Sequence, residues 1–176
     1  MTARDGLAME VCCGKESAGR DTCELPPAGF GRAPRHRAMC PECQEVGKPV
    51  ATRTVQAMLA VSLRLLTAHD YFFCRTASCP VVYFAAGDAE RYGVKDVRER
   101  VFQKEPDAED VFVCYCFRHR VGEFRSSSDQ ERQGRLQDIR DGISTEQCAC
   151  DMRNPQGSCC LGNVMALARV LGSAAA

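Results

Sequence analysis

The sequence predicts an α+β protein made of two small units, each organised around its own set of cysteines. Three observations support this expectation. The 176-residue chain contains 13 cysteines, and most of them stand in close pairs. Short runs rich in β-branched and aromatic residues alternate with segments whose apolar residues have helical spacing. A charged segment that contains proline, KEPDAED, separates the two halves and is typical of a linker.

The first 37 residues differ from the rest of the chain. Glycine, proline and charged residues dominate them, and neither helical nor strand periodicity is sustained. We therefore expect residues 1–37 to form a flexible arm. The arm contains three cysteines, Cys12, Cys13 and Cys23.

Residues 38–104 are expected to form a small α+β unit. A short strand near residues 49–53 leads into a helix that begins at Thr54, whose hydroxyl can cap the first turn. Three further strands are predicted by β-branched and aromatic content or by alternation with charged residues, at residues 70–73, 81–85 and 94–102.

Residues 105–173 predict a mainly helical unit. It opens with a strand near residues 111–113. A helix is expected over residues 129–143, because Leu136, Ile139 and Ile143 share one face. A loop rich in cysteine follows, and a last helix is expected from about residue 161 to residue 171.

Composition argues against several classes of function. The chain has 23 basic and 23 acidic residues, so overall charge gives no reason to expect a nucleic-acid partner. The one basic stretch, residues 32–37, is short and broken by proline, which favours a solvated loop. No apolar run approaches the roughly 18 to 20 residues that a membrane span requires. The N-terminus does not resemble an export signal, so we expect a cytoplasmic protein whose thiols are reduced.

Two cysteine pairs in the first unit predict a zinc-type site. Cys40 and Cys43 form a C-x-x-C knuckle, and Cys74 and Cys79 form a second pair after a predicted strand. Four thiolates on two turns match the closed tetrahedral coordination of structural zinc. A redox role for the C-x-x-C is less favoured, because no thioredoxin-like context surrounds it. His69 lies nearby in sequence and is interpreted as a loop residue.

The second unit contains the other cysteine set. A compact C-x-C pair precedes a group of four cysteines in which Asn154-Pro155 and Gly157 predict a tight turn. Four thiolates from this set suit a [2Fe–2S] cluster. A second zinc site is the alternative, and spacing alone leaves it open. The six cysteines are Cys114, Cys116, Cys148, Cys150, Cys159 and Cys160.

Four segments in this order carry a family resemblance: CPEC, DYFFCRTASCPVVYF, VCYCF and NPQGSCCLG. Together they resemble the N-terminal domain of CopZ-type copper chaperones that carry zinc and a [2Fe–2S] cluster. The cluster half is in turn similar to bacterioferritin-associated ferredoxin. The resemblance implies zinc on the first set and a cluster on four members of the second. The implied ligands are Cys40, Cys43, Cys74 and Cys79 for zinc, and Cys114, Cys116, Cys150 and Cys160 for the cluster.

The sequence departs from the family in two ways. Cys148 and Cys159 compete with the implied cluster ligands. Cys150 is preferred for its spacing to Asn154, and Cys160 because it can cap the last helix. The family's ferredoxin-like copper module with an M-x-C-x-x-C loop is also absent from these 176 residues. Copper delivery by the usual route is therefore not an expectation that the resemblance supports.

Three functions are weighed from these features. The first is a metallochaperone or metal-homeostasis protein for copper or another soft metal, with a metal transporter or redox protein as partner. The second is a small [2Fe–2S] electron carrier serving a reductase, and the third is an interaction module with structural metals. No nucleophile–base set or phosphate loop is found in the sequence, so we expect no enzyme. Two four-ligand sites leave five cysteines over, and the thiols of the arm could bind Cu(I) or Hg(II) transiently.

Overall fold

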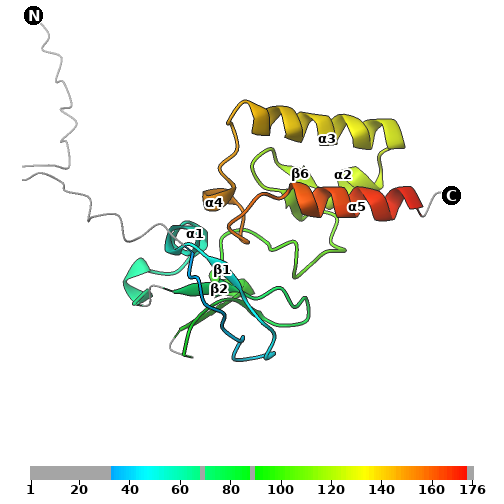
Figure 1. The fold of residues 1–176 in the computed structure, drawn as a ribbon. Coiled ribbons are helices and arrows are strands. Elements are labelled where there is room, and N and C mark those ends of the chain that lie inside the picture. The colour runs from blue at the N-terminus through cyan, green and yellow to red at the C-terminus, as the bar shows by residue number, and fades with distance from the viewer. Residues whose placement is uncertain (1–32, 68–69, 88–89, 174–176) are drawn as a thin grey trace, which may run out of the picture.

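A computed structural model describes residues 33–67, 70–87 and 90–173. The predicted arm therefore lies outside the described residues up to residue 32. The first layer is a four-stranded antiparallel sheet in the order β1-β2-β3-β4, at the bottom of Figure 1. Its strands are β1 (Lys48–Val50), β2 (Tyr71–Phe73), β3 (Val81–Ala85) and β4 (Arg91–Gly93).

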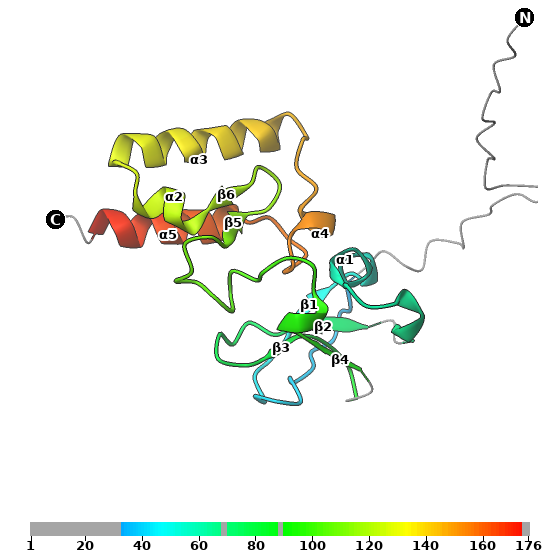
Figure 2. The same cartoon turned by 180° about the vertical axis from the view of Figure 1, so that it is seen from behind.

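The second part of the fold is mainly helical and lies on the other side of α1 (Thr52–Met58) and α4 (Cys150–Arg153), as Figures 1 and 2 show. It contains a two-stranded ribbon and three further helices. These elements are β5 (Phe112–Cys114), β6 (His119–Arg120), α2 (Val121–Arg125), α3 (Asp129–Ser144) and α5 (Leu161–Ser173). Two short 3₁₀ turns, η1 (Leu63–Leu65) and η2 (Val94–Asp96), complete the described elements.

The sheet is buried on both faces because its side chains alternate between two apolar clusters. Tyr71, Phe73 and Tyr83 pack on the α1 side together with Val55 and Leu59 of that helix region. Phe72, Phe84 and Val81 instead pack with three of the zinc-type cysteines, Cys40, Cys74 and Cys79. At the register shift between Val81 and Tyr83, the consecutive residues Val82 and Tyr83 both lie in the cluster on the α1 side. The sheet therefore forms the floor beneath the first cysteine set.

The helical part has its own core, in which α5 packs against α3, α2 and β5. Val113, Phe124, Ile139 and Val164 are fully buried in it. The helix α3 begins at a capping box. Ser128 Oγ accepts from the Glu131 N–H at 3.4 Å, and the Glu131 carboxylate accepts from the Ser128 N–H at 2.7 Å.

The two parts are joined where α4 packs on α1. The hydroxyl of Thr54 donates to the carbonyl of Asp151 over 2.7 Å, and Arg53 forms an ion pair with the Asp151 carboxylate at 2.5 Å. Residues 154–157 follow α4 and also lie against the first unit, where the Tyr83 hydroxyl donates to Pro155 O at 2.6 Å. The loop that carries the last cysteines is therefore seated on the sheet unit.

Three expected elements differ from the structure. The strand expected at residues 49–53 is β1 (Lys48–Val50), and the helix that Thr54 was expected to cap already begins at Thr52. The Thr54 side chain is buried and bonds Asp151, so it does not cap the helix. The edge strand expected at residues 94–102 is instead a 3₁₀ turn at Val94–Asp96 followed by an isolated bridge between Leu59 and Val97.

The remaining predicted elements differ little from the structure. The strand expected at residues 81–85 is found there, and α3 and α5 begin at the expected residues. The chain has a mixed α/β fold; whether its helical part is of the ferredoxin type, and where the unit boundaries lie, stay predictions. Among the described helices, none combines the length and apolarity needed to cross a membrane.

Candidate metal centres

The first cysteine set comes from two tight loops that face each other. The Cys40–Cys43 knuckle is closed by two backbone bonds, from Gln44 N to Cys40 O at 2.9 Å and from Cys40 N to Glu45 O at 2.8 Å. Cys74 follows β2 directly, and its N–H donates to Val82 O at 2.9 Å. Cys79 stands two residues before β3. Strand pairing therefore holds the second loop opposite the knuckle.

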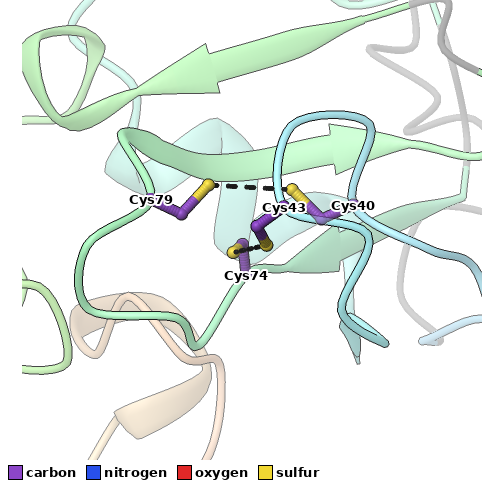
Figure 3. A group of neighbouring side chains, drawn as sticks. All are labelled: Cys40, Cys43, Cys74 and Cys79. Carbon is purple, nitrogen blue, oxygen red and sulfur yellow. Dashed lines mark hydrogen bonds between the residues drawn. The ribbon is translucent and has the colours of Figure 1, made fainter.

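The four sulfurs lie close enough to hold one metal ion, as Figure 3 shows. Cys40 Sγ and Cys79 Sγ are 3.9 Å apart, and Cys43 Sγ and Cys74 Sγ are 3.6 Å apart. All four sulfurs lie within 4.8 Å of one another. A tetrahedral zinc ion with Zn–S bonds of about 2.3 Å separates its sulfurs by about 3.8 Å. The set therefore fits zinc without rearrangement of the loops.

The set is partly shielded from water. Cys40, Cys74 and Cys79 are buried, whereas Cys43 is partly exposed. Burial raises the pKa of Cys79 to about 12 and also raises the pKa of Cys40. Burial opposes ionisation of Cys43 too, but its hydrogen bonds with Thr76, the backbone at Glu45 and the neighbouring thiols lower its pKa to about 7. A bound cation would favour the thiolate form of all four.

Two polar groups surround this set. Thr76 Oγ1 lies 3.3 Å from Cys43 Sγ, where its hydroxyl can donate to a thiolate. Lys104, only 9% exposed, donates from its ammonium to Thr76 O at 2.7 Å. Sequence reasoning missed Lys104, because it is distant along the chain from all four cysteines and no local pattern marks it.

The second cysteine set gathers where β5, α4 and α5 meet. Cys114 ends β5, Cys150 begins α4, and Cys160 stands immediately before α5. The Cys160 carbonyl accepts the first helical bonds, from Asn163 N at 2.9 Å and from Val164 N at 3.1 Å. Helix α5 therefore begins directly at this cysteine, as expected from the sequence.

Thiol contacts join neighbouring cysteines within this set. Cys116 Sγ and Cys150 Sγ are 3.5 Å apart, and the Ala149 N–H donates to Cys116 Sγ at 3.4 Å. Interaction with the thiols of Cys116 and Cys160 lowers the pKa of Cys150 to about 2. Interaction with the Cys160 thiol likewise lowers the pKa of Cys114. The same contacts act in the opposite direction on their partners: the contact with Cys150 raises the pKa of Cys116, and the contact with Cys114 raises the pKa of Cys160.

The other two cysteines of the set lie at its edge. Cys159 is exposed, and Cys148 is partly buried. The pKa of Cys148 is raised by burial and by the nearby thiols of Cys150 and Cys159. These two cysteines therefore border the other four on the side of Cys150. Cys114, Cys116, Cys150 and Cys160, the four ligands that the family resemblance implies, interact with one another through these contacts. The choice of cluster ligands stays a prediction.

Side chains from the first unit hold the loop between Cys150 and Cys160. Lys48 Nζ donates to Gln156 O at 3.0 Å and bonds the Ser158 hydroxyl. Within the loop, Asn154 Nδ2 donates to Ser158 O at 2.7 Å. Gly157 adopts a positive φ of 64°. Sequence reasoning identified the turn but missed the contacts of Lys48, Thr54 and Tyr83, because their partners are far away along the chain.

The described histidines take no part in either cysteine set. His119 Nε2 lies 2.9 Å from Asp138 Oδ2, and its ring packs edge-on against Phe124. His36 packs edge-on against Phe72. His69, Cys12, Cys13 and Cys23 lie outside the described residues.

Comparisons with known proteins bear on these sites. Residues 37–98 match the zinc binding domain of CopZ. The chain is 34% identical over 121 residues to the copper chaperone CopZ of Archaeoglobus fulgidus. That alignment covers 69% of this chain and 57% of the relative, so the chain spans little more than half of the relative's length.

The fold comparison agrees with the sequence comparisons. The X-ray structure of the N-terminal domain of Archaeoglobus fulgidus CopZ is similar to this chain, with a TM-score of 0.57 and 29% sequence identity. The match covers 73% of this chain and 96% of that domain. The matched zinc binding domain contains all four cysteines of the first set.

Proposed function

We propose that this chain is a copper-handling protein with two resident metal centres, because residues 37–98 match the zinc binding domain of CopZ and the chain is 34% identical to a copper chaperone over 121 residues. The observation that carries the proposal is the four-cysteine cluster, whose sulfurs lie within 4.8 Å of one another. In this proposal Cys40, Cys43, Cys74 and Cys79 hold one zinc ion. Zinc with four protein ligands cross-links two loops and has no open coordination position, so its role is structural.

The second centre is proposed to be a [2Fe–2S] cluster on Cys114, Cys116, Cys150 and Cys160. The ribbon supplies the first two sulfurs and the loop supplies the other two. Support comes from the 3.5 Å contact between Cys116 and Cys150 and from the N–H bond of Ala149 to the Cys116 sulfur. Hydrogen bonds to sulfur tune and stabilise iron–sulfur centres. A second zinc ion is the alternative occupant.

The cargo is proposed to be a soft ion, Cu(I) in the first place and Hg(II) as an alternative. Thiols outside the two four-cysteine sets are the ligands that such an ion prefers. Cys159 is exposed and Cys148 is partly buried, so both are accessible beside the second centre. The thiols of the N-terminal arm remain the other proposed carriers. The expected partner is a metal transporter or a redox protein.

A second candidate is a small electron carrier. Its support is the position of the second cysteine set near the surface, where Cys116 is only partly buried and Cys159 is exposed. A cluster held by these cysteines would lie a short distance below the surface, which favours electron exchange with a partner protein. In either role we propose that the protein is not an enzyme and works in the cytoplasm.

Metal analysis of anaerobically purified protein tests the proposal. We expect one zinc and two irons per chain, visible absorption, and an S = 1/2 EPR signal after reduction. A colourless protein with two zinc ions would contradict the cluster and leave the first site intact. Titration with Cu(I) in the presence of a competing chelator then tests the cargo, and an affinity no higher than that of glutathione would reject copper handling.

A further inference from the structure

A basic hollow lies on the surface of the first unit, beside the zinc-type knuckle. It has a volume of about 450 Å³. Three segments meet around it: the chain before the knuckle, the start of β1, and the residue after Cys74. They contribute four cationic side chains and one histidine, namely Arg35, Arg37, Lys48, Arg75 and His36. We call this site the basic hollow.

The arginines of the basic hollow lack ion-pair partners. Arg35, Arg37 and Arg75 are exposed, and none forms an ion pair with another described residue. No lining residue is acidic, and the carboxylate of Asp70 lies 4.0 Å from the ring nitrogen of His36. Burial and the nearby charge of Arg75 lower the pKa of Lys48, so the cations repel one another. Such a gathering of like charges creates a local positive potential that attracts an anionic group.

The scaffold beneath the basic hollow is fixed. The His36 ring packs edge-on against buried Phe72 at 5.3 Å between centroids. The Gly47 N–H donates to Ala38 O at 2.9 Å, and a side chain at Gly47 would collide with the Phe84 ring. The Lys48 ammonium is held by a backbone carbonyl of the cysteine loop. The hollow is thus formed in advance, which lowers the entropic cost of binding.

The composition of the lining favours a peptide over a nucleic acid. Val46, 47% exposed, and Pro49 line the hollow beside the arginines, so both charged and apolar contacts are offered. Arginine beside apolar surface is typical of protein interfaces. The single aromatic ring of the lining, His36, is already packed on Phe72, so none is free to stack a base. The chain's formal net charge of zero adds no overall attraction for a nucleic acid.

We propose that the basic hollow is a docking site for an acidic segment of a partner protein, one that also carries apolar side chains. Arg35, Arg37 and Arg75 would bind its carboxylates, and Val46 and Pro49 would contact its apolar side chains. Arg75 directly follows Cys74 of the zinc-type set, so the docked segment would lie beside this site. The proposal does not depend on which metals the chain carries.

A labelled peptide tests this proposal with the full-length zinc-loaded protein. The probe is an eight-residue peptide of alternating glutamate and leucine, compared with the same peptide in which glutamine replaces glutamate. Fluorescence anisotropy measures affinity, and amide chemical shifts locate the binding site. We expect the acidic peptide to bind saturably and to shift the amide signals of residues 35–37, 46–48 and 75. The glutamine peptide should bind at least about tenfold more weakly.

Two variants with the same change in net charge distinguish binding at the basic hollow from a general effect of the protein's charge. In the first, Arg35, Arg37 and Arg75 are each changed to Glu. In the second, three exposed cations away from the hollow are changed in the same way: Arg64→Glu, Arg91→Glu and Lys95→Glu. We expect about a tenfold loss of affinity in the first variant and less than a twofold loss in the second.

Several outcomes would overturn the proposal. Equal losses in the two variants would assign binding to net charge alone. Equal binding of the acidic and glutamine peptides would remove the role of the carboxylates. Tighter binding of a twelve-residue oligothymidylate, lost in the same hollow variant, would make the site a nucleic-acid site instead. Displacement of the peptide by millimolar inorganic phosphate would make it a small-anion site. Zinc content, measured on each variant, reports whether a loss comes from a disrupted knuckle.

Discussion

The ammonium of Lys104 donates a 2.7 Å hydrogen bond to the carbonyl of Thr76, whose hydroxyl lies 3.3 Å from the sulfur of Cys43. Lys104 is 9% exposed and has no carboxylate partner among the described residues. A buried cation is costly unless an anion balances it. Four thiolates around Zn²⁺ carry about two net negative charges, so the loaded knuckle can supply that anion.

Replacing Lys104 by Met should therefore weaken zinc binding and leave the zinc-free protein no less stable. We expect zinc to dissociate about tenfold faster to a chromogenic chelator, which corresponds to about 1.4 kcal/mol. Lys104→Arg, which keeps the charge, should dissociate at nearly the wild-type rate. The exposed Lys95→Met variant is the control for loss of a lysine elsewhere. Equal rates in all four proteins would show that Lys104 does not balance the site.

Removing one zinc-type cysteine should remove both the metal and much of the stability of the first unit. For Cys79→Ser we expect zinc content to fall from one to zero, because three thiolates lose the closed coordination. Unfolding free energy should fall by on the order of 5 kcal/mol, since binding of structural zinc is coupled to folding. Elemental analysis and urea denaturation measure the two quantities. Exposed Cys159→Ser should keep its zinc, and retention of zinc by Cys79→Ser would contradict the assignment.

Single substitutions in the second set should distinguish central from peripheral cysteines. We expect Cys150→Ser and Cys160→Ser to lose most of the visible absorption of anaerobically purified protein, because both side chains are buried in the set. Cys148→Ser and Cys159→Ser should keep it, because both residues lie at the edge of the set. Absorption spectra and iron content at equal protein concentration provide the measurement. If Cys159→Ser loses its iron and Cys160→Ser keeps it, the ligand assignment is reversed.

The Thr54 hydroxyl should stabilise the cysteine loop from a distance. Thr54→Val removes the 2.7 Å bond to the Asp151 carbonyl and leaves that acceptor without this donor. We expect a loss of about 1 to 2 kcal/mol in unfolding free energy and faster bleaching of the visible absorption in air. Thr54→Ser keeps the donor and should bleach at the wild-type rate. Identical bleaching of the Val and Ser variants would show that the bond does not support the loop.

Two glycines should respond to alanine in opposite directions. Gly157 has a φ of 64°, and a Cβ there would lie 3.1 Å from Thr54 Oγ1. Gly157→Ala should therefore destabilise the protein by about 1 to 2 kcal/mol. Gly134 lies in α3 with no atom within 4 Å of a Cβ, so Gly134→Ala should stabilise by about 0.5 to 1 kcal/mol. Denaturant unfolding measures both, and a neutral Gly157→Ala would contradict the role of the turn.

Local patterns predicted the elements whose stability is local. Residues 81–85 form the expected strand because every side chain there is β-branched, aromatic or small and is buried. Helix α3 begins at Asp129, directly after its N-cap Ser128, at the residue expected from the sequence. In contrast, α2 and α4 span 5 and 4 residues, too few for a helical period to show in the sequence. Val94 and Val97 are spaced three apart, so their apparent alternation with charges concealed a 3₁₀ turn.

The candidate sites divide in the same way. Paired spacing predicted that Cys40, Cys43, Cys74 and Cys79 would meet, and the structure brings them together. Spacing could not choose between Cys159 and Cys160, because adjacent residues differ only in the direction of their side chains. Thr54 was misinterpreted as a cap, since its true partner, Asp151, is 97 residues away. Contacts of that separation leave no local pattern in a sequence.

The seating of residues 154–158 on the sheet unit has a consequence for the order of assembly. The contacts of Lys48 with Ser158 and of Tyr83 with Pro155 span 110 and 72 residues. Such high-contact-order pairings form late, after the loop-closure entropy has been overcome. During synthesis the knuckle and its strands leave the ribosome first and can fold as a unit. The last cysteines then close onto a platform already in place, so the second cysteine set is completed after the first.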